Sequence, residues 1–316
     1  MMSITTNTIR RLNDVNGKTI VEHTDNCGTW YAEKASSEVY NMTVKNVPGC
    51  DRYAVNVTYR NPETGRRFNR SHNVYLTDFL AFYADSDEHY NDEDLWQLVA
   101  DFMRDFLQNH VFCTNHTGKM TGLNSCSTSA AKNARCQARA NCNNDNCICK
   151  HCFALAQMAY QKSMGLKYVR NTEILTGLYI QPNWIPEETA NDIFRFESFG
   201  DLANVQQIEN YCTIAAERPN VTHTLWTKNP DIIAEYIADG GAIPENMIII
   251  YSSPLVNHCA AGILEKYPFI SKTFTVWTDE EAAKAAGVTI NCGARSCNTC
   301  RRCYTPGRDE VNELLK

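Results

Sequence analysis

The sequence predicts an α/β protein: a partial (β/α) barrel over residues 113–316, preceded by a smaller β-rich α+β region over residues 1–112. The barrel is predicted because short apolar runs alternate with helix-like segments through the second half, which is typical of parallel strands with right-handed crossovers. About six strands are expected, too few to close the usual eight-stranded barrel. The first region differs because β-branched runs follow one another closely there.

The N-terminal region is expected to contain several strands and one long helix. Alternating or β-branched runs occupy residues 18–23, 29–32, 39–44 and 53–59. Residues 61–67 read NPETGRR and predict a hairpin turn between strands at 55–60 and 68–75. Apolar residues at helical spacing predict an amphipathic helix over residues 92–109. The hairpin carries four arginines that would either contact phosphate or be solvated: Arg60, Arg66, Arg67 and Arg70.

The second half carries the alternation itself. Candidate strands lie at residues 178–181, 194–198, 224–227, 247–252, 274–277 and 289–291. Helices are expected at residues 201–217, 229–238 and 278–286. The second of these helices opens with Asn229 followed by Pro230, and glycines follow the last two, as helix boundaries require.

Composition and charge exclude several classes of protein. Hydrophobic residues make up 43% and charged residues 21%, so wholesale disorder is excluded. The net charge is −6, which disfavours nucleic-acid binding without excluding it. No Gly-x-Gly-x-x-Gly follows a candidate strand, so the dinucleotide-binding fingerprint is missing. No secretory signal and no apolar run long enough for a membrane span is present, which predicts a cytoplasmic protein without a membrane partner.

Cysteine is the unusual component, with 15 residues, ten of which are clustered. The C-terminal cluster has the spacing C-x4-C-x2-C-x2-C, formed by Cys292, Cys297, Cys300 and Cys303. Four thiolates at such spacing complete either a tetrahedral zinc site or an iron–sulfur cluster, and the close packing favours the cluster. Three nearby arginines would offset the thiolate charge: Arg295, Arg301 and Arg302.

A central cluster of cysteines precedes an apolar-periodic helix. Cys149 and Cys152 are separated by two residues, and a further ligand must come from Cys126, Cys136, Cys142 or Cys147. A thiolate at a helix N-terminus is stabilised by the dipole and by free amides. Three cysteines on a four-iron cluster would leave one iron open for substrate, whereas the alternative interpretation is a second structural zinc site.

The chain resembles the bacteriophage gene product 88 family. The resemblance covers residues 118–306 and is carried by segments such as KMTGLNSCSTS, CQAR, CKHCFA, FRFESFGDL, LWTKNP and the run of residues 292–304. It implies a phage-encoded protein in the host cytoplasm. It also implies two groups of ligands, three central and four C-terminal: Cys136, Cys149, Cys152, Cys292, Cys297, Cys300 and Cys303.

A more distant resemblance is to the radical S-adenosylmethionine superfamily, whose core is a partial barrel and whose cluster is held by three cysteines. Here the spacing is C-x12-C-x2-C, with a longer first gap. The resemblance implies that Glu197, Ser198 and Asp201 contact the cofactor, and that Glu197 and Asp201 serve the chemistry. Asp201 as a helix N-cap and Glu197 as a satisfied strand-end residue are the alternative.

Two further residues end candidate strands where α/β barrels build their sites. Lys228 is a candidate for catalysis or for binding the carboxylate of S-adenosylmethionine, and Ser252 for binding the cofactor. Two classes of function follow. One is a radical S-adenosylmethionine enzyme with one or two [4Fe–4S] clusters and an unknown small or macromolecular substrate. The other is a non-catalytic protein stapled by iron–sulfur or zinc, which senses redox state or binds a host partner or nucleic acid.

Overall fold

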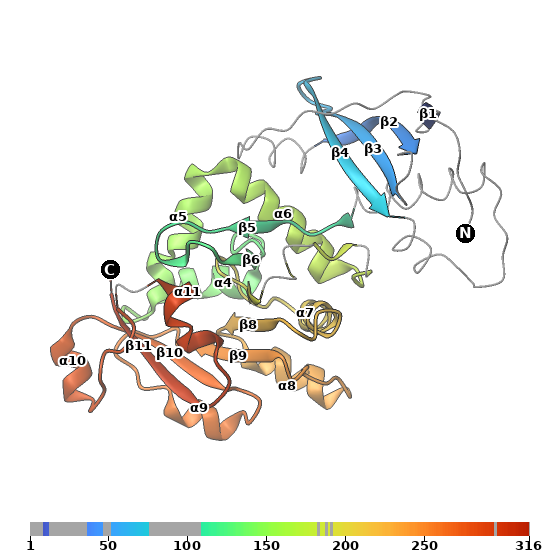
Figure 1. The fold of residues 1–316 in the computed structure, drawn as a ribbon. Helices are drawn as coiled ribbons and strands as arrows, with labels where there is room; N and C mark the ends of the chain where they lie inside the picture. Colours follow the sequence, from blue (N-terminus) through green and yellow to red (C-terminus); the bar gives the residue numbers. More distant parts are fainter. Residues whose placement is uncertain are drawn as a thin grey trace. The chain divides into compact units, whose positions relative to one another are not determined.

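The computed structural model describes residues 9–12, 37–46, 52–75, 109–181, 184–186, 189, 192–293 and 296–315. The chain divides into two compact units, Met1–His110 and Val111–Lys316 (Figure 1). The predicted strands at residues 18–23 and 29–32 lie outside the described residues, as does all but the last residue of the predicted helix at 92–109.

The first unit contains a four-stranded antiparallel sheet in the order β1-β2-β3-β4. Its strands are β1 (Ile9–Leu12), β2 (Glu38–Asn46), β3 (Arg52–Arg60) and β4 (Arg67–Tyr75). The predicted hairpin is confirmed: Arg60 pairs with Arg67, and the side chain of Asn61 accepts bonds from the backbone of Glu63 and Thr64. Gly65 takes the left-handed φ of 68° that the turn needs.

The second unit is built on a seven-stranded mixed sheet in the order β11-β10-β9-β8-β7-β6-β5. Strands β6 to β11 are parallel, and β5 pairs with β6 in the antiparallel sense. The strands are β5 (Cys113–Asn115), β6 (Asn124–Cys126), β7 (Ile193–Phe196), β8 (Thr222–Thr227), β9 (Met247–Ser252), β10 (Lys272–Trp277) and β11 (Asp309–Leu314). The predicted α/β class is therefore confirmed.

The described part of this sheet is open, with β5 and β11 at its edges, and does not form a closed barrel. Consecutive strands are nevertheless neighbours throughout. Helices fill the connections: α4 (Ala134–Ala140), α5 (Phe153–Tyr160), α6 (Lys162–Gly177), α7 (Val205–Ala216), α8 (Pro230–Ala238), α9 (Ala261–Lys266) and α10 (Glu280–Ala285). The chain also includes α11 (Cys297–Cys300) and the 3-10 helices η1 (Gly118–Met120), η2 (Ile148–His151) and η5 (Arg302–Tyr304).

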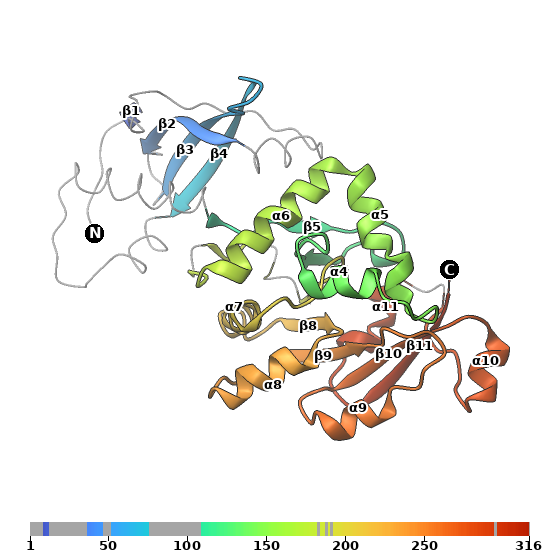
Figure 2. The same ribbon diagram turned by 180° about the vertical axis from the view of Figure 1, so that it is seen from behind.

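Alternation along β7 separates the two faces of the sheet. Phe194 and Phe196 belong to the large core with residues of α7 and α8, such as Ile208 and Ile233. Ile193 faces the other way and packs with Tyr304. The two views place α8 and α9 on one side of the sheet and the segment carrying α11 on the other (Figures 1 and 2). Cys297 and Cys300 of α11 therefore lie on the side of the sheet opposite α8 and α9.

Four predicted strands and all three predicted helices of this unit are present, but two predicted strands are wrong. Leu178 caps the C-terminus of α6, and the next residues form no strand, because the backbone N–H of Ile180 donates to the side chain of Asn210 instead. Residues 289–291 also form no strand. Three strands were missed, two because they have only three residues and β11 because it is mostly polar.

Candidate metal centre

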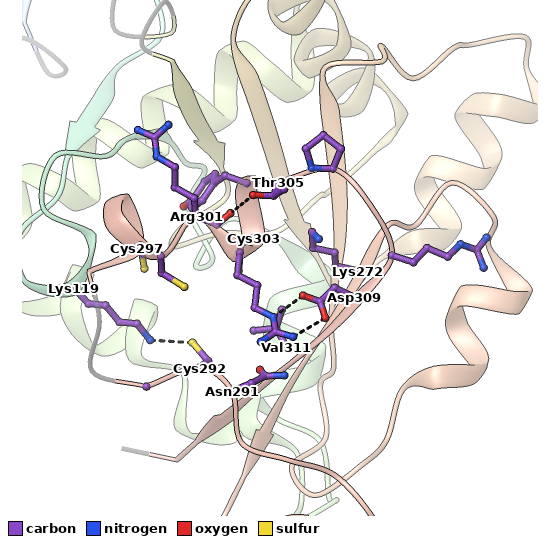
Figure 3. Close-up of a pocket in the computed structure, with 16 residues that line it drawn as sticks. Lys119, Lys272, Asn291, Cys292, Cys297, Arg301, Cys303, Thr305, Asp309 and Val311 are labelled. Carbon is purple, nitrogen blue, oxygen red and sulfur yellow. Dashed lines mark hydrogen bonds and ion pairs between the residues drawn. The ribbon is translucent and has the colours of Figure 1, made fainter.

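The four C-terminal cysteines line one pocket of about 690 Å³. Figure 3 shows its lining, in which Lys119 points toward Cys292. The other three predicted ligands of this group also line the pocket. Cys297 begins α11, Cys300 ends it, and Cys303 lies in η5. Spacing alone predicted that the four would gather, and the fold places them around one hollow.

Backbone hydrogen bonds fix the chain at two cysteines of this group, Cys292 and Cys300. The backbone N–H of Cys292 donates to Asn312 of β11 at 2.9 Å, and Cys300 closes α11 by donating to Ser296 at 2.8 Å. Arg301 then adopts a left-handed φ of 51°, which turns the chain into η5. Tyr304 follows Cys303 and is buried against Leu123 and Ile193. The segment thus depends on anchors at its two ends.

Cations surround this group of thiols. Lys119 Nζ lies 3.0 Å from Cys292 Sγ and 2.8 Å from a carboxylate oxygen of Glu313. Arg302 binds Asp309 through two bonds of 2.5 and 2.8 Å. Arg301 lines the same pocket, whereas Arg295 lies outside the described residues. Positive charge at these positions favours thiolates, as a metal centre needs.

Burial opposes ionisation of two of these thiols. It raises the pKa of Cys297, and it raises the pKa of Cys303 to about 12, while the nearby charges of Lys119 and Arg195, respectively, act in the opposite direction. Arg195 is held with its guanidinium 4.2 Å from the centroid of the Trp226 ring. A metal would therefore have to displace protons from these thiols.

The central cysteines come from three adjoining pieces of chain. Cys136 lies in α4, whose N-cap Asn133 accepts the backbone N–H of Cys136 at 3.3 Å. Cys149 lies in η2, and Cys152 is the cap between η2 and α5. Burial raises the pKa of Cys136, and it raises that of Cys149 to about 11, while Lys228 and Arg139 act on both thiols in the opposite direction. The two thiols therefore share one pair of cations.

Asp201 and Lys228 meet at the carboxyl edge of the sheet, after β7 and β8. Asp201 accepts bonds from Thr227 Oγ1 at 2.6 Å and from the backbone N–H of Lys228 at 3.1 Å. Arg139 Nη1 lies 3.6 Å from an oxygen of the same carboxylate. Lys228 Nζ donates to Ser252 Oγ at 3.3 Å, at the end of β9. Three of the predicted site residues thus form one network beside the central cysteines.

Glu197 and Ser198 also follow β7, but both are buried. The carboxylate of Glu197 accepts bonds from Tyr211, Thr128 and Gln207, at 2.5, 2.8 and 2.6 Å. Burial raises the pKa of this carboxyl to about 7, against the effect of these hydrogen bonds. Ser198 Oγ is bonded to the hydroxyls of Ser125 and Ser127. These bonds engage both side chains within the protein. The contacts with a cofactor that the sequence predicted for them stay predictions.

The sequence analysis missed two cations of these sites. Arg139 lies one helical turn after Cys136, so the spacing on a helix could have identified it. It donates to the carbonyl of Lys228 at 3.0 Å. Lys119 gave no such signal, because 173 positions separate it from Cys292.

The C-terminal thiols line one pocket. Within the described ranges, no three His, Cys, Asp or Glu side chains are placed close enough together to hold one metal ion. The described part of the chain also has no helix of the length and apolarity that crossing a membrane takes.

Comparison with known proteins gives one match. The family model described as gene product 88 matches residues 107–311, which is more than half of the chain. The chain therefore belongs to the gene product 88 family. Neither the curated proteins nor the solved structures gave a match.

Proposed function

We propose that this member of the gene product 88 family is an iron–sulfur protein with a C-terminal and a central thiolate-ligated centre. One observation carries the proposal: Cys292, Cys297, Cys300 and Cys303 line a single pocket together with Lys119. Cysteine thiolates hold iron–sulfur clusters, and nearby charges and hydrogen bonds to the sulfurs tune them.

The spacing of the cysteines supports a cluster over a single zinc ion. Zinc sites usually separate two C-x2-C pairs by a longer stretch of chain. Here Cys297, Cys300 and Cys303 follow one another at two-residue spacing, which is closer to the ligation of ferredoxin-type clusters. Such a cluster would accept and donate single electrons.

The test is the metal content of the full chain. The protein is purified without oxygen, and iron, zinc and acid-labile sulfide are counted per chain. About eight irons with matching sulfide would agree with two four-iron clusters. Cys297→Ala should lose about half of the iron, and Cys259→Ala, which changes a lone exposed thiol, should lose none. Zinc without sulfide would contradict the proposal.

A second candidate is a radical S-adenosylmethionine-like enzyme, favoured by the order of the sheet. Six parallel strands, β6 to β11, follow one another as neighbours, which agrees with the partial barrel of that superfamily. Cys136, Cys149 and Cys152 would hold the cluster at its carboxyl edge. There Lys228 and Arg139 would attract the carboxylate of S-adenosylmethionine. Asp201 would orient the guanidinium of Arg139, and Ser252 would orient the ammonium of Lys228.

This candidate is tested by spectroscopy of the reduced protein. Its electron paramagnetic resonance spectrum should change when S-adenosylmethionine is added, and Lys228→Ala should weaken the response. Lys266→Ala is the matched control, because Lys266 is exposed at the end of α9 and its ammonium lies 4.9 Å from the centroid of the Tyr267 ring. Iron with no response to the compound would leave the non-catalytic alternative, a redox sensor or a partner-binding protein.

A further inference from the structure

The sheet of the first unit has no role in the proposed function, and its charge is opposite to that of the whole chain. Strands β1 to β4 and the turn between β3 and β4 contain eight Lys or Arg and two Glu, so their net charge is +6. The whole chain has a net charge of −6. Charges further apart than the Debye length, about 8 Å at physiological salt, are largely screened from one another. The acidity of the chain therefore does not decide what this sheet binds.

The two faces of this sheet differ in polarity, because successive side chains of a strand point to opposite faces. Val55 and Val57 of β3 are fully buried on one face. Arg60 of β3 lies on the other face, opposite Arg67 of β4, and Ser71 of β4 lies on that face too. Arg67 and Ser71 are exposed. One face thus belongs to the apolar core, whereas the other presents guanidinium and hydroxyl groups, which are common donors to phosphate.

Tyr40 holds two guanidiniums at one end of this sheet. The pairing of β2 with β3 shifts between Val39 and Asn41, so Tyr40 is the extra residue of a β-bulge, which re-aims its side chain. The guanidinium carbons of Arg60 and Arg67 lie 4.8 and 4.2 Å from the centroid of its ring. Arg67 Nη2 also donates to the hydroxyl of Tyr40 at 3.0 Å. Like charges directly opposite each other destabilise a pair of strands, and an anion beside both guanidiniums would relieve that repulsion.

Arg66 is placed at the same end of the sheet by the turn between β3 and β4. Its backbone carbonyl accepts the N–H of Asn61 at 2.9 Å, and its own N–H donates to Thr64 Oγ1 at 3.3 Å. Its side chain is exposed, and Glu63 is the carboxylate of this turn. A guanidinium presents a planar fork of N–H groups that matches two oxygens of a phosphate. Three such groups therefore gather at one end of the sheet.

We propose that this end of the sheet binds the phosphate backbone of a nucleic acid. Arg60, Arg66 and Arg67 contact phosphates, and Tyr40 positions the first and the last of them. A nucleic acid fits better than an acidic protein, because its charges follow one another closely, one per about 1.7 Å of duplex axis. Contacts with phosphate carry no sequence information, so the binding is independent of base sequence. The site lies in the first unit and does not depend on either proposed metal centre.

The experiment measures how salt weakens binding of the full chain to a fluorescently labelled DNA duplex and to one of its strands alone, by fluorescence anisotropy. The logarithm of the binding constant should fall linearly with that of the salt concentration. Arg66→Gln and Arg67→Gln should each reduce the slope on the duplex by about 0.9, because each removes one phosphate contact. Arg67→Lys keeps the charge and should keep the slope. Lys284→Gln, which changes an exposed cation of α10, is the control and should bind like wild type.

Tyr40 has its own readout. Tyr40→Phe keeps the ring and should bind like wild type, whereas Tyr40→Leu should bind several-fold more weakly with the slope of wild type, because all three charges remain. Circular dichroism of each variant ensures that lost binding is not lost folding. The proposal is overturned if neither DNA form binds at low salt, or if Arg66→Gln and Arg67→Gln both bind like wild type. Equally tight binding of polyglutamate would overturn it too, by showing a surface for acidic proteins.

Discussion

The two cysteine regions differ in what positions their thiols. The C-terminal ligands all lie in residues 292–303, in a segment whose regular elements span only four and three residues. The central ligands lie on and around helices that are capped and bonded to the sheet edge, as Asn133 is to the carbonyl of Asp201 at 2.8 Å. The comparison predicts that the C-terminal segment would depend more on the proposed metal for its structure than the central region, whose helices are held by protein contacts.

The largest expected effect tests this difference directly. Cys303→Ala should lose about four irons per chain and several kcal/mol of stability, because a structural metal contributes its binding energy to folding. Cys136→Ala should lose a similar amount of iron but much less stability. Iron per chain is counted as above, and the stability is measured by thermal unfolding followed by circular dichroism, with Cys259→Ala as the control for both. Equal destabilisation by the two variants would contradict the comparison.

The next effect concerns Glu197, which lies at the sheet edge near the central region. Burial raises its pKa from 4.5 to about 7, so the folded state retains a proton that the unfolded state releases. Stability should therefore fall as the pH rises from about 4.5 to about 7, by on the order of 3 kcal/mol. Glu197→Gln should remove this fall, as measured by urea unfolding across that range.

Asp279→Asn is the control for the pH experiment. Asp279 caps α10 by accepting the backbone N–H of Ala282 at 2.8 Å, and asparagine can cap equally well. Hydrogen bonding to this backbone N–H lowers the pKa of Asp279, so its own contribution is lost only as the pH falls. The fall in stability toward neutral pH should persist in this variant. Its persistence in Glu197→Gln as well would show that another group causes it.

A smaller effect is expected at Asp201. Asp201→Asn weakens the bonds from Thr227 and Lys228 and the ion pair with Arg139, and should cost about 2 kcal/mol. The central iron should become easier to remove with a chelator while the C-terminal iron stays. Asp231→Asn breaks an exposed ion pair with Arg135 and should change neither the stability nor the removal of the central iron. Equal loss of both irons in Asp201→Asn would mean that the centres are not independent.

The smallest effect is expected at Lys119. Lys119→Met removes the bonds to Cys292 and Glu313 and should cost about 1 kcal/mol, since the pair is partly exposed. Only the C-terminal iron should become easier to remove. Lys150→Met, which breaks a surface pair with Asp145, should leave that iron unchanged. If Lys119→Met affects the central iron alone, the assignment of Lys119 to the C-terminal pocket is wrong.

The sequence identified the parallel core because its signal is local. Apolar strands such as residues 247–252 are buried whatever their neighbours, and helix boundaries follow from caps such as Asn229 with Pro230. The sequence did not predict strand β11, because the strand is mostly polar. Its polar side chains find hydrogen-bond partners far away in the sequence, as Asn312 does by accepting the indole N–H of Trp277 at 2.9 Å. The predicted strand at residues 178–181 is wrong because of another distant partner: the side chain of Asn210 accepts the backbone N–H of Ile180.

The sequence by itself determined the α/β class, the hairpin of the first unit and the close spacing of the C-terminal cysteines. These depend on residues that are neighbours along the chain. Only the tertiary structure decided that Lys119 reaches Cys292, that Arg139 and Lys228 meet at Asp201, and that Glu197 turns into a buried network. Each of these contacts joins residues from separate elements, and their approach is fixed by the order of the strands, which no local pattern contains.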